Sequence, residues 1–428
     1  MTHPIAVIVI CDGNRPDFIT DATTPTMAAL RRAGAWHDNH RGIFPSATRA
    51  SSASIATGSF PLAHGLRGNA VALPVPGGFE YHNAGKPEFF DTYRAHYGRM
   101  LSRPAMSERV AGLGTALIAS NVSPGAAFFH DSYSHAQMLH RHESYAPGRS
   151  AMPPLPATPG HAGDRVVTEA FIAVLLERRP PVATLWLSEP DVSMHAAPLG
   201  SDLHLQALAQ ADTLVAQVAE AVGRLRDAGH DVLFMLGSDH GHESVTEVVP
   251  VERRLFEAGF KADLDSPELI VVPQGCSAFI HFAGPALARK AEVGDWLRER
   301  DWVEEVIEGE DLPKLGQIPG ADVIAIDMAK IDDTNIKGVR GLSAMATRFN
   351  EDEDAVRTHC GMHGGRGYYE SRPVLLAVGG AFEAGSIHKG QTSITDIAPT
   401  VMAHLGLPVD GMDGRALQPR VALAMESA

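Results

Sequence analysis

The stretch IAVIVICDG, residues 5–13, decides the fold class. Its first six residues are apolar and mostly β-branched, and a glycine closes the stretch, which is typical of a central parallel strand buried on both faces. Asp12 then follows the end of the predicted strand. The apolar run is too short for the hydrophobic region and cleavage site of a signal peptide, so we expect it to stay in the mature protein.

Similar buried runs recur along the chain with helical segments between them. VATLWL (182–187), DVLFML (231–236) and PVLLAV (373–378) are predicted strands. Between the first two, residues 202–228 carry apolar side chains at helical spacing. Alternation of strands and helices predicts an α/β fold, with a doubly wound, mostly parallel central sheet and helices on both faces. Further helices are predicted at 26–33, 49–57, 164–177 and 395–405.

The character of the sequence changes after about residue 250. Strand-like segments at 277–282 and 303–307 surround a predicted helix at 286–300. This composition is typical of a small α+β unit inserted into a larger domain. The predicted domains are therefore a core of residues 1–250 and 351–428, and an inserted cap of residues 251–350.

Residues 70–160 are rich in Gly, Pro, Tyr and His and have few periodic segments apart from GTALIA, 114–119. We expect loops that lie over the core on the substrate side. The aromatic side chains of this region either stack on a nucleobase or aryl leaving group, or pack the loops against the core. They include Phe79, Tyr81, Phe89, Phe90, Tyr93, Tyr97, Phe128, Phe129 and Tyr133.

The charge and cysteine content exclude several classes of partner. A formal net charge of −15 disfavours a nucleic acid polymer or an anionic membrane as partner, because either would be repelled by most of the surface. A small anionic substrate then requires a local positive site, which bound divalent cations supply. Three widely spaced cysteines make no disulfide framework and predict a reducing, cytoplasmic location. No apolar run approaches the length of a membrane span.

Four separated fragments place acidic or imidazole side chains at predicted strand ends or in a glycine-rich loop. Asp191 and His195 are one helical turn apart, so both can face one cation. An isolated Asp–His pair is more often structural, but six such groups at strand ends favour a metal site. Oxygen and nitrogen donors without thiolate suit zinc, and also manganese or iron. The six candidate ligands are Asp12, Asp191, His195, Asp239, His240 and His363.

The sequence also resembles a known family in a set of ordered motifs. They are CDG (11–13), FPSAT (44–48), ATG (56–58), HG (64–65), EPDVSMH (189–195), SDHG (238–241), GMHGG (361–365) and TDIAPTVMAHLGLP (395–408). In this order they resemble the alkaline phosphatase superfamily, and most closely its nucleotide pyrophosphatase/phosphodiesterase branch and the related phosphonoacetate hydrolases. The resemblance covers residues 1–70, 180–245 and 355–418, and it implies an alkaline phosphatase-like fold.

The resemblance implies two divalent metal ions. One would be held by Asp191, His195 and His363. The second would be held by Asp12, Asp239 and His240, with the oxygen of Thr48 directed toward it.

The resemblance further implies that Thr48 is the nucleophile and forms a phospho-threonine intermediate. The helix that starts near Thr48 would favour the alkoxide and the incoming anion. Asn69 matches a position at which relatives place an amide donor to a phosphoryl oxygen, although a turn asparagine after Gly68 explains it equally well. His242 and His359 match no ligand position, so we expect them around the ligands or at the surface.

The substrate class is left with two alternatives. A phosphodiesterase is expected first and phosphonoacetate hydrolysis, which cleaves a C–P bond, second. Phosphonoacetate hydrolases hold the substrate carboxylate with lysines after the second strand, and the corresponding segment 118–123 has none. Arg94, Arg99, Arg103 and Arg141 are candidates to replace them. A catalytically inactive metal-binding protein is the alternative from another class, although no ligand and no nucleophile is missing.

Overall fold

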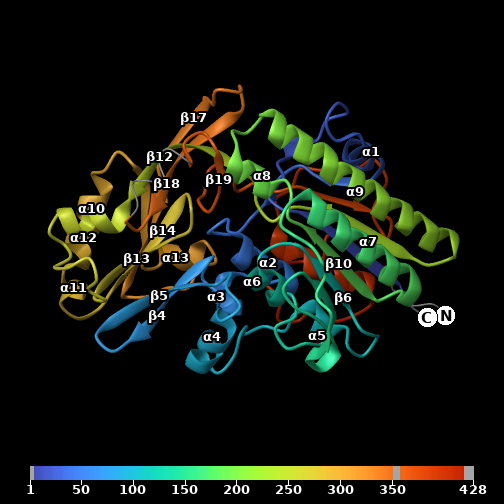
Figure 1. Cartoon of the computed structure of the whole chain (residues 1–428), viewed down its shortest axis with the longest axis horizontal. Coiled ribbons are helices and arrows are strands. Elements are labelled where there is room, and N and C mark those ends of the chain that lie inside the picture. Colours follow the sequence, from blue (N-terminus) through green and yellow to red (C-terminus); the bar gives the residue numbers. More distant parts are fainter. Residues whose placement is uncertain (1–3, 350–356, 419–428) are drawn as a thin grey trace, which may run out of the picture.

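The computed structural model describes residues 4–349 and 357–418, and a ten-stranded sheet forms its centre (Figure 1). The strand order is β21-β2-β20-β11-β1-β10-β6-β7-β8-β9, and only β20 and β8 run against the others. The predicted doubly wound, mostly parallel α/β fold is confirmed. The strands are β1 (Ile5–Cys11), β2 (Ala35–His37), β6 (Leu117–Ser120), β7 (Gln137–His140), β8 (Ser144–Ala146), β9 (Ser150–Met152), β10 (Val182–Leu187), β11 (Val232–Gly237), β20 (Leu375–Val378) and β21 (Ile387–His388).

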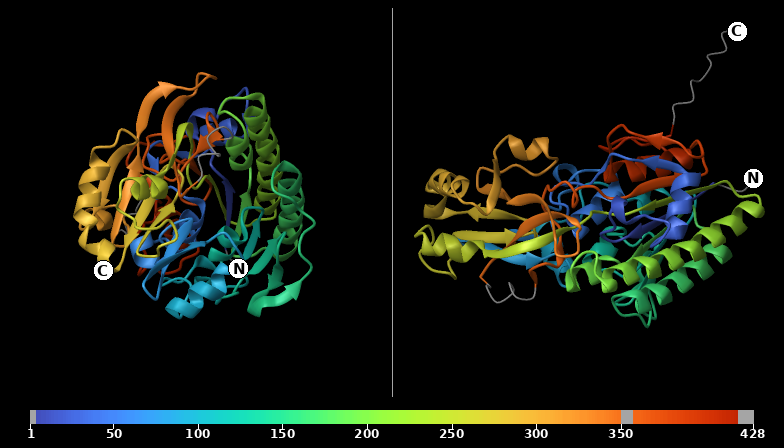
Figure 2. Two further views of the ribbon diagram at one scale, coloured as in Figure 1. Left: turned by 60° about the vertical axis from the view of Figure 1, so that its left-hand side comes forward. Right: turned by 90° about the horizontal axis from the view of Figure 1, so that it is seen from above.

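Helices cover both faces of this sheet because alternate residues of β1 point to opposite sides. Ile8 and Ile10 pack with α2 (Thr48–Thr57) and α15 (Ile397–His404). Val7 and Val9 pack with α1 (Pro25–Ala33), α7 (His161–Arg178) and α9 (Asp202–Asp227). Seen from above, the long green helices and the red C-terminal segment lie on opposite sides of the sheet (Figure 2).

Two smaller sheets lie beside the central sheet. One is antiparallel, with order β13-β14-β16-β15, and the other has order β17-β18-β12-β19. Their strands are β12 (Glu243–Pro250), β13 (Leu269–Pro273), β14 (Ser277–Phe282), β15 (Val303–Glu308), β16 (Val323–Met328), β17 (Lys330–Thr334), β18 (Arg340–Thr347) and β19 (Gly361–Met362). The accompanying helices are α10 (Val251–Glu257), α11 (Gly284–Ala288), α12 (Lys290–Arg298) and α13 (Asp311–Lys314). The predicted helix 286–300 is thus two helices separated at Arg289.

The division into a core of residues 1–250 and 351–428 and a cap of residues 251–350 stays a prediction. β12 and β19 belong to the predicted core ranges, whereas β18 belongs to the predicted cap. These strands share one sheet, in which β12 pairs with both β18 and β19. Backbone pairing therefore joins the two parts directly, and the site described below lies beside this junction.

The prediction of loops for residues 70–160 is wrong in part. The region forms the hairpin of β4 (Ala70–Val75) and β5 (Gly78–Asn83), and the hairpin contacts β13. It also contains α4 (Phe89–Tyr97), α5 (Met106–Arg109) and α6 (Pro124–Phe129), while β7, β8 and β9 extend the central sheet. Strands of three or four residues carry too few side chains to show a period. In the described residues, no helix combines the length and apolar character that crossing a membrane requires.

Candidate metal centre and nucleophile

The three central strands bring their following acidic residues to one edge of the sheet. β10 and β11 flank β1, and all three strands are parallel. Asp12 follows β1, Asp239 follows β11, and Asp191 is the first residue of α8 (Asp191–Ala196) after β10. The carboxyl ends of parallel strands are where α/β folds bind ligands. Convergence of these side chains is therefore a consequence of the strand order.

Asp12, Asp239 and His240 form one candidate metal site. Their potential ligand atoms all lie within 4.8 Å of one another, and all three side chains are buried. His240 Nε2 lies 3.0 Å from Asp239 Oδ2 and 3.4 Å from Asp12 Oδ1. Neither of these oxygens accepts a hydrogen bond from the described residues, whereas Trp186 and the Gly13 amide donate to the other two carboxylate oxygens. Two unsatisfied buried acceptors facing one point fit a bound cation.

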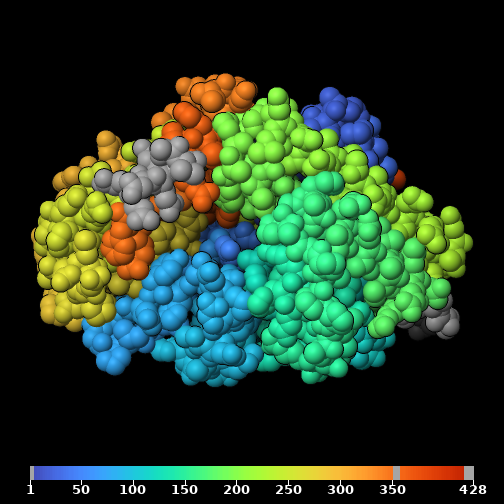
Figure 3. Space-filling view, viewed as in Figure 1, coloured from blue at the N-terminus to red at the C-terminus, as the bar shows by residue number. Residues whose placement is uncertain are grey.

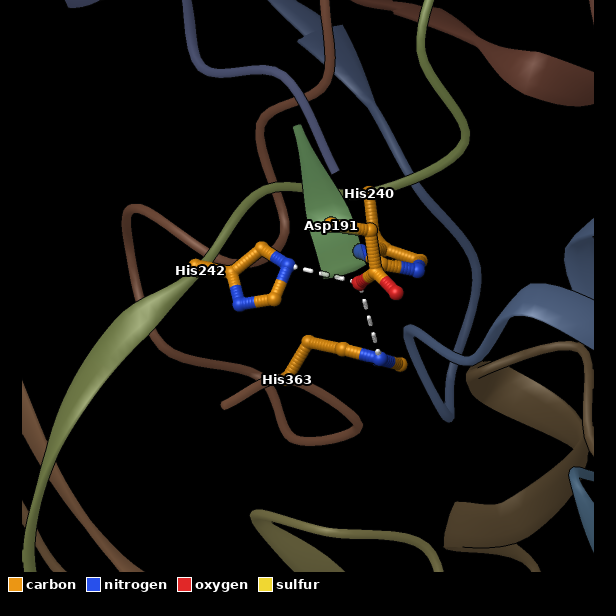
Figure 4. A group of neighbouring side chains, drawn as sticks. All are labelled: Asp191, His240, His242 and His363. Carbon is orange, nitrogen blue, oxygen red and sulfur yellow. Dashed lines mark hydrogen bonds and ion pairs between the residues drawn. The ribbon is translucent and has the colours of Figure 1, made fainter. Parts of the chain in front are cut away.

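Asp191 is the centre of a second candidate site (Figure 4). Its Oδ1 lies 3.3 Å from His195 Nε2, 3.7 Å from His363 Nε2 and 2.9 Å from His242 Nε2. The potential ligand atoms of Asp191, His240, His242 and His363 all lie within 4.8 Å of one another. His195 is outside that group. The His240 and His363 rings stack at 3.6 Å, so the two candidate sites adjoin.

The predicted histidine ligands share one hydrogen-bonding arrangement. Nδ1 of His195 lies 2.9 Å from Gly361 O, Nδ1 of His363 lies 2.7 Å from Ser46 O, and Nδ1 of His240 lies 3.1 Å from Gly241 O. A carbonyl accepts only from a protonated nitrogen, so the Nδ1 of each ring carries a proton and Nε2 is the nitrogen left to bind a metal. All three predicted histidine ligands therefore present Nε2 to the centre.

His242 has the opposite arrangement. Its Nε2 faces Asp191 Oδ1, and its buried Nδ1 has no partner among the described residues. Nε2–H donating to Asp191 would orient that carboxylate. Gly13 makes room for the ring, because a Cβ at Gly13 would lie 2.5 Å from His242 Nε2. We therefore assign His242 the role of positioning Asp191, while His359 is exposed at the surface.

We expect His242→Gln to weaken binding of the metal at Asp191 by roughly 10- to 100-fold, the usual effect of removing a residue that orients a ligand. Both metals should still bind at saturating concentration. Titration with a competing chelator measures this affinity. His359→Gln serves as the control, and equal affinities for the two variants would show that His242 does not position the ligand.

The electrostatics of the cluster favour cation binding. The pKa of Asp12 is raised well above its usual value, first by burial and then by repulsion from Asp239 and Asp191. The pKa of His363 is lowered well below its usual value, first by burial and then by His240. A neutral imidazole and closely spaced carboxylates are the forms that a divalent cation stabilises.

Thr48 lies next to the first candidate site, at the start of α2. Its Oγ1 is 3.1 Å from His240 Nε2, and the residue is 7% exposed. Ser46 holds the preceding loop, since its hydroxyl donates to Gly365 O and accepts from the Gly364 amide, both at 2.9 Å. Because Ser46 O also accepts a hydrogen bond from the His363 ring, one residue connects the loop before Thr48 with a predicted metal ligand.

Two cavities flank this centre, and Figure 3 shows the surface hollowed above it, with blue atoms of the N-terminal part of the chain at the base. The larger has a volume of about 580 Å³ and is lined by Asn69, Tyr81, Gln274 and Arg348, among others. The smaller has a volume of about 200 Å³ and is lined by Asp12, Thr48, Arg141 and Asp191, among others. Arg49, His195 and His363 line both cavities.

Comparison with known proteins assigns the family. A sequence model described as type I phosphodiesterase / nucleotide pyrophosphatase matches residues 6–314. The chain belongs to this family. The predicted branch of the alkaline phosphatase superfamily is confirmed, and with it hydrolysis of phosphoester bonds as the class of reaction. A search of curated proteins found no match.

Solved structures of this phosphodiesterase family share the fold. An inactive threonine-to-alanine variant of murine ectonucleotide pyrophosphatase/phosphodiesterase 5 in complex with AMP has a TM-score of 0.69 and 16% identity, covering 96% of this chain and 97% of that chain. A second structure of the same murine protein has a TM-score of 0.67 and 17% identity, with coverage of 96% and 97%. At these identities the likeness establishes the alkaline phosphatase-like fold.

Three side chains at the candidate metal centre and its cavities were not predicted from the sequence. Ser46 lies inside the FPSAT motif, but the residues that it contacts in the loop of His363 are separated from it by at least 317 positions in the sequence. The side-chain oxygen of Gln274 accepts a hydrogen bond from the backbone N–H of Asn69 at 2.6 Å. Arg49 lines both cavities. Only the position of Arg49 directly after the predicted nucleophile was a signal in the sequence.

Proposed function

We propose that this protein is a two-metal phosphodiesterase that uses Thr48 as its nucleophile. The observation that carries the proposal is the Thr48 hydroxyl at the start of α2, 3.1 Å from His240 and beside both groups of candidate ligands. Asp12, Asp239 and His240 would hold one metal, and Asp191, His195 and His363 the other. The donor set suits zinc, while manganese and iron remain alternatives. The two ions would supply positive charge that lowers the pKa of attacking oxygens and stabilises leaving oxygens.

The chain's own residues account for both halves of the reaction. The Thr48 hydroxyl lies 3.1 Å from His240 Nε2, and its oxygen attacks phosphorus as its proton is lost, with one proton taken up by the departing alcohol oxygen. The bond from phosphorus to the first alcohol breaks, and that alcohol leaves as the phospho-threonine forms. Water then attacks phosphorus, breaks the bond to Thr48 and releases a phosphate monoester, so the hydroxyl is restored.

The size of the larger cavity supports a nucleotide-like arm on the substrate. Its volume of about 580 Å³ is in the range of small-molecule sites, which span roughly 300–1,000 Å³. The related murine structure holds AMP, a phosphorus compound of this kind. Tyr81 lines the cavity and offers a ring face for a planar group.

Asn69 fits the role of an amide donor to the phosphoryl group. Its Oδ1 accepts a hydrogen bond from the backbone N–H of Arg49 at 2.8 Å, and its side-chain nitrogen donates to none of the described residues. We expect Asn69→Asp to keep the acceptor, and so the start of α2, but to lower kcat by roughly 100-fold or more through loss of the donor. Steady-state kinetics measures the loss, with metal content and melting temperature as controls. An unimpaired kcat would identify Asn69 as a structural turn residue.

A substrate panel tests the proposed function. The zinc-loaded protein is assayed with an aryl phosphodiester, an aryl phosphomonoester, a nucleoside triphosphate and phosphonoacetate. We expect the diester or the triphosphate to be hydrolysed fastest. Preference for phosphonoacetate would favour C–P bond cleavage instead, and no turnover of any compound would favour an inactive metal-binding protein.

The cytoplasmic location is a further proposal, supported by three free, buried cysteines.

A further inference from the structure

The smaller cavity beside Thr48 is lined by two arginines. Arg49 is the second residue of α2, and Arg141 follows β7. The cavity volume of about 200 Å³ is below the roughly 300 Å³ at which drug-sized ligand sites begin. It therefore suits a small group attached close to the reacting phosphorus.

Neither arginine forms an ion pair with a carboxylate among the described residues. Arg49 Nε donates to Ser123 Oγ at 3.1 Å, and Arg141 donates to the backbone and side-chain oxygens of Asn121. Their other guanidinium nitrogens have no hydrogen-bond partner in the described part of the chain. Arg348 in the larger cavity differs, because Glu252 accepts from it at 2.6 and 3.0 Å.

The surroundings hold both guanidinium groups in place. Ser123 caps α6 by accepting from the Ala126 amide, so the partner of Arg49 is fixed by a helix start. Asn121, the partner of Arg141, donates to Asp164 Oδ1 at 2.8 Å. Arg141 is thus anchored through neutral acceptors and keeps its charge available. Guanidinium groups fixed in this way are suited to bind a planar or tetrahedral oxyanion.

The acidic side chains that line this cavity have a proposed role of their own. Asp12 and Asp191 line the same cavity, and both act to raise the pKa of Arg49 while burial acts first to lower it. These two carboxylates are the proposed metal ligands. Once they face cations, the positive charge of the arginines is left for a ligand in the cavity.

We propose that Arg49 and Arg141 form an acid-binding subsite, which recognises a second anionic group on the substrate within a few bonds of the reacting phosphorus. This inference rests on the proposed function and narrows its substrate class to phosphorus compounds with a small acidic arm, either a carboxylate or a further phosphate. Of the four arginines considered from the sequence as replacements for the absent lysines, Arg141 lines the cavity, whereas Arg94, Arg99 and Arg103 do not.

Three matched ligands of the zinc-loaded full chain test the subsite. Phosphonoacetate carries a carboxylate, methylenediphosphonate carries a second phosphonate, and acetonylphosphonate replaces the carboxylate of phosphonoacetate with an uncharged ketone arm. Dissociation constants are measured by calorimetry and, independently, as inhibition of aryl diester hydrolysis. The variants are Arg141→Gln and, as control, Arg99→Gln, which removes an exposed arginine at another cavity.

We expect one or both acidic ligands to bind the wild type about 10- to 100-fold more tightly than acetonylphosphonate, since charge-assisted hydrogen bonds contribute that much. The preference should fall about tenfold in Arg141→Gln and stay unchanged in Arg99→Gln. The acid that shows the effect identifies the arm as carboxylate or phosphate. Equal binding of all three ligands, or a preference that survives in Arg141→Gln, overturns the proposal. A wild type that shows the preference but hydrolyses no diester would instead contradict the proposed function alone.

Discussion

Thr48→Ala is expected to abolish phosphoryl transfer while the protein keeps both metals. The substitution removes the hydroxyl that lies 3.1 Å from His240 Nε2 and leaves all six candidate ligands in place. Loss of a nucleophile in enzymes of this chemical type lowers kcat by roughly 10⁴-fold or more. Turnover of an aryl diester, together with elemental analysis of the purified variant, measures both effects.

Thr48→Ser is the matched control for this variant. It restores the hydroxyl, so it should form a phospho-serine and recover measurable turnover. Brief acid quenching during turnover, followed by peptide mass spectrometry, should detect phosphate on residue 48 in the wild type and in Thr48→Ser. Turnover near the wild-type rate in Thr48→Ala would show that Thr48 is not the nucleophile.

His363→Ala is expected to release one of the two metals and to lower kcat by roughly 100-fold or more, the scale of a lost electrostatic contact in the transition state. His363 is buried, faces Asp191 Oδ1 through Nε2 and is fixed by Ser46 through Nδ1. Metal content should fall from two ions per chain to one. The site of Asp12 and Asp239 should remain filled, because it draws no ligand atom from His363.

His96→Ala provides the comparison, because His96 is an exposed imidazole on α4. It should keep two metals and full activity. Elemental analysis after dialysis, alongside kinetics, separates the variants. If His363→Ala still binds two metals, His363 is not a ligand. A lower metal content in both variants would indicate a general effect on folding.

The fold was predictable where strands are long and fully buried. β1, β10 and β11 stand in the sequence as runs of six or seven residues without a charge, and all seven residues of β1 are buried. The edge of the sheet was not predictable in the same way. β8 and β9 have three residues each, so they show no period, and pairing with their neighbours determines their structure.

The aromatic residues of the 70–160 region show how tertiary structure resolves an ambiguity of the sequence. Phe89, Phe90, Phe128 and Phe129 are buried in one hydrophobic core cluster with residues of α2, which confirms the packing alternative for them. Of the nine aromatic residues named in the sequence analysis, Tyr81 lines the larger cavity at the metal centre. No local feature of the sequence separates Tyr81 from the others.

The candidate site was also predictable from the sequence only in part. Asp12, Asp191 and Asp239 follow buried strands, so their meeting could be predicted from strand order alone. The role of His242 could not, because it depends on which ring nitrogen faces Asp191. The cavity shared by Arg49 and Arg141 also depends on segments that are far apart in the chain.

The most direct test of the metal centre is an anomalous difference map at the zinc absorption edge, from crystals of the zinc-loaded protein. We expect two peaks beside Thr48, each about 2.0–2.2 Å from its ligand atoms. One should contact Asp12, Asp239 and His240, and the other Asp191, His195 and His363. A single peak, or peaks bound by other side chains, would contradict the proposed metal centre.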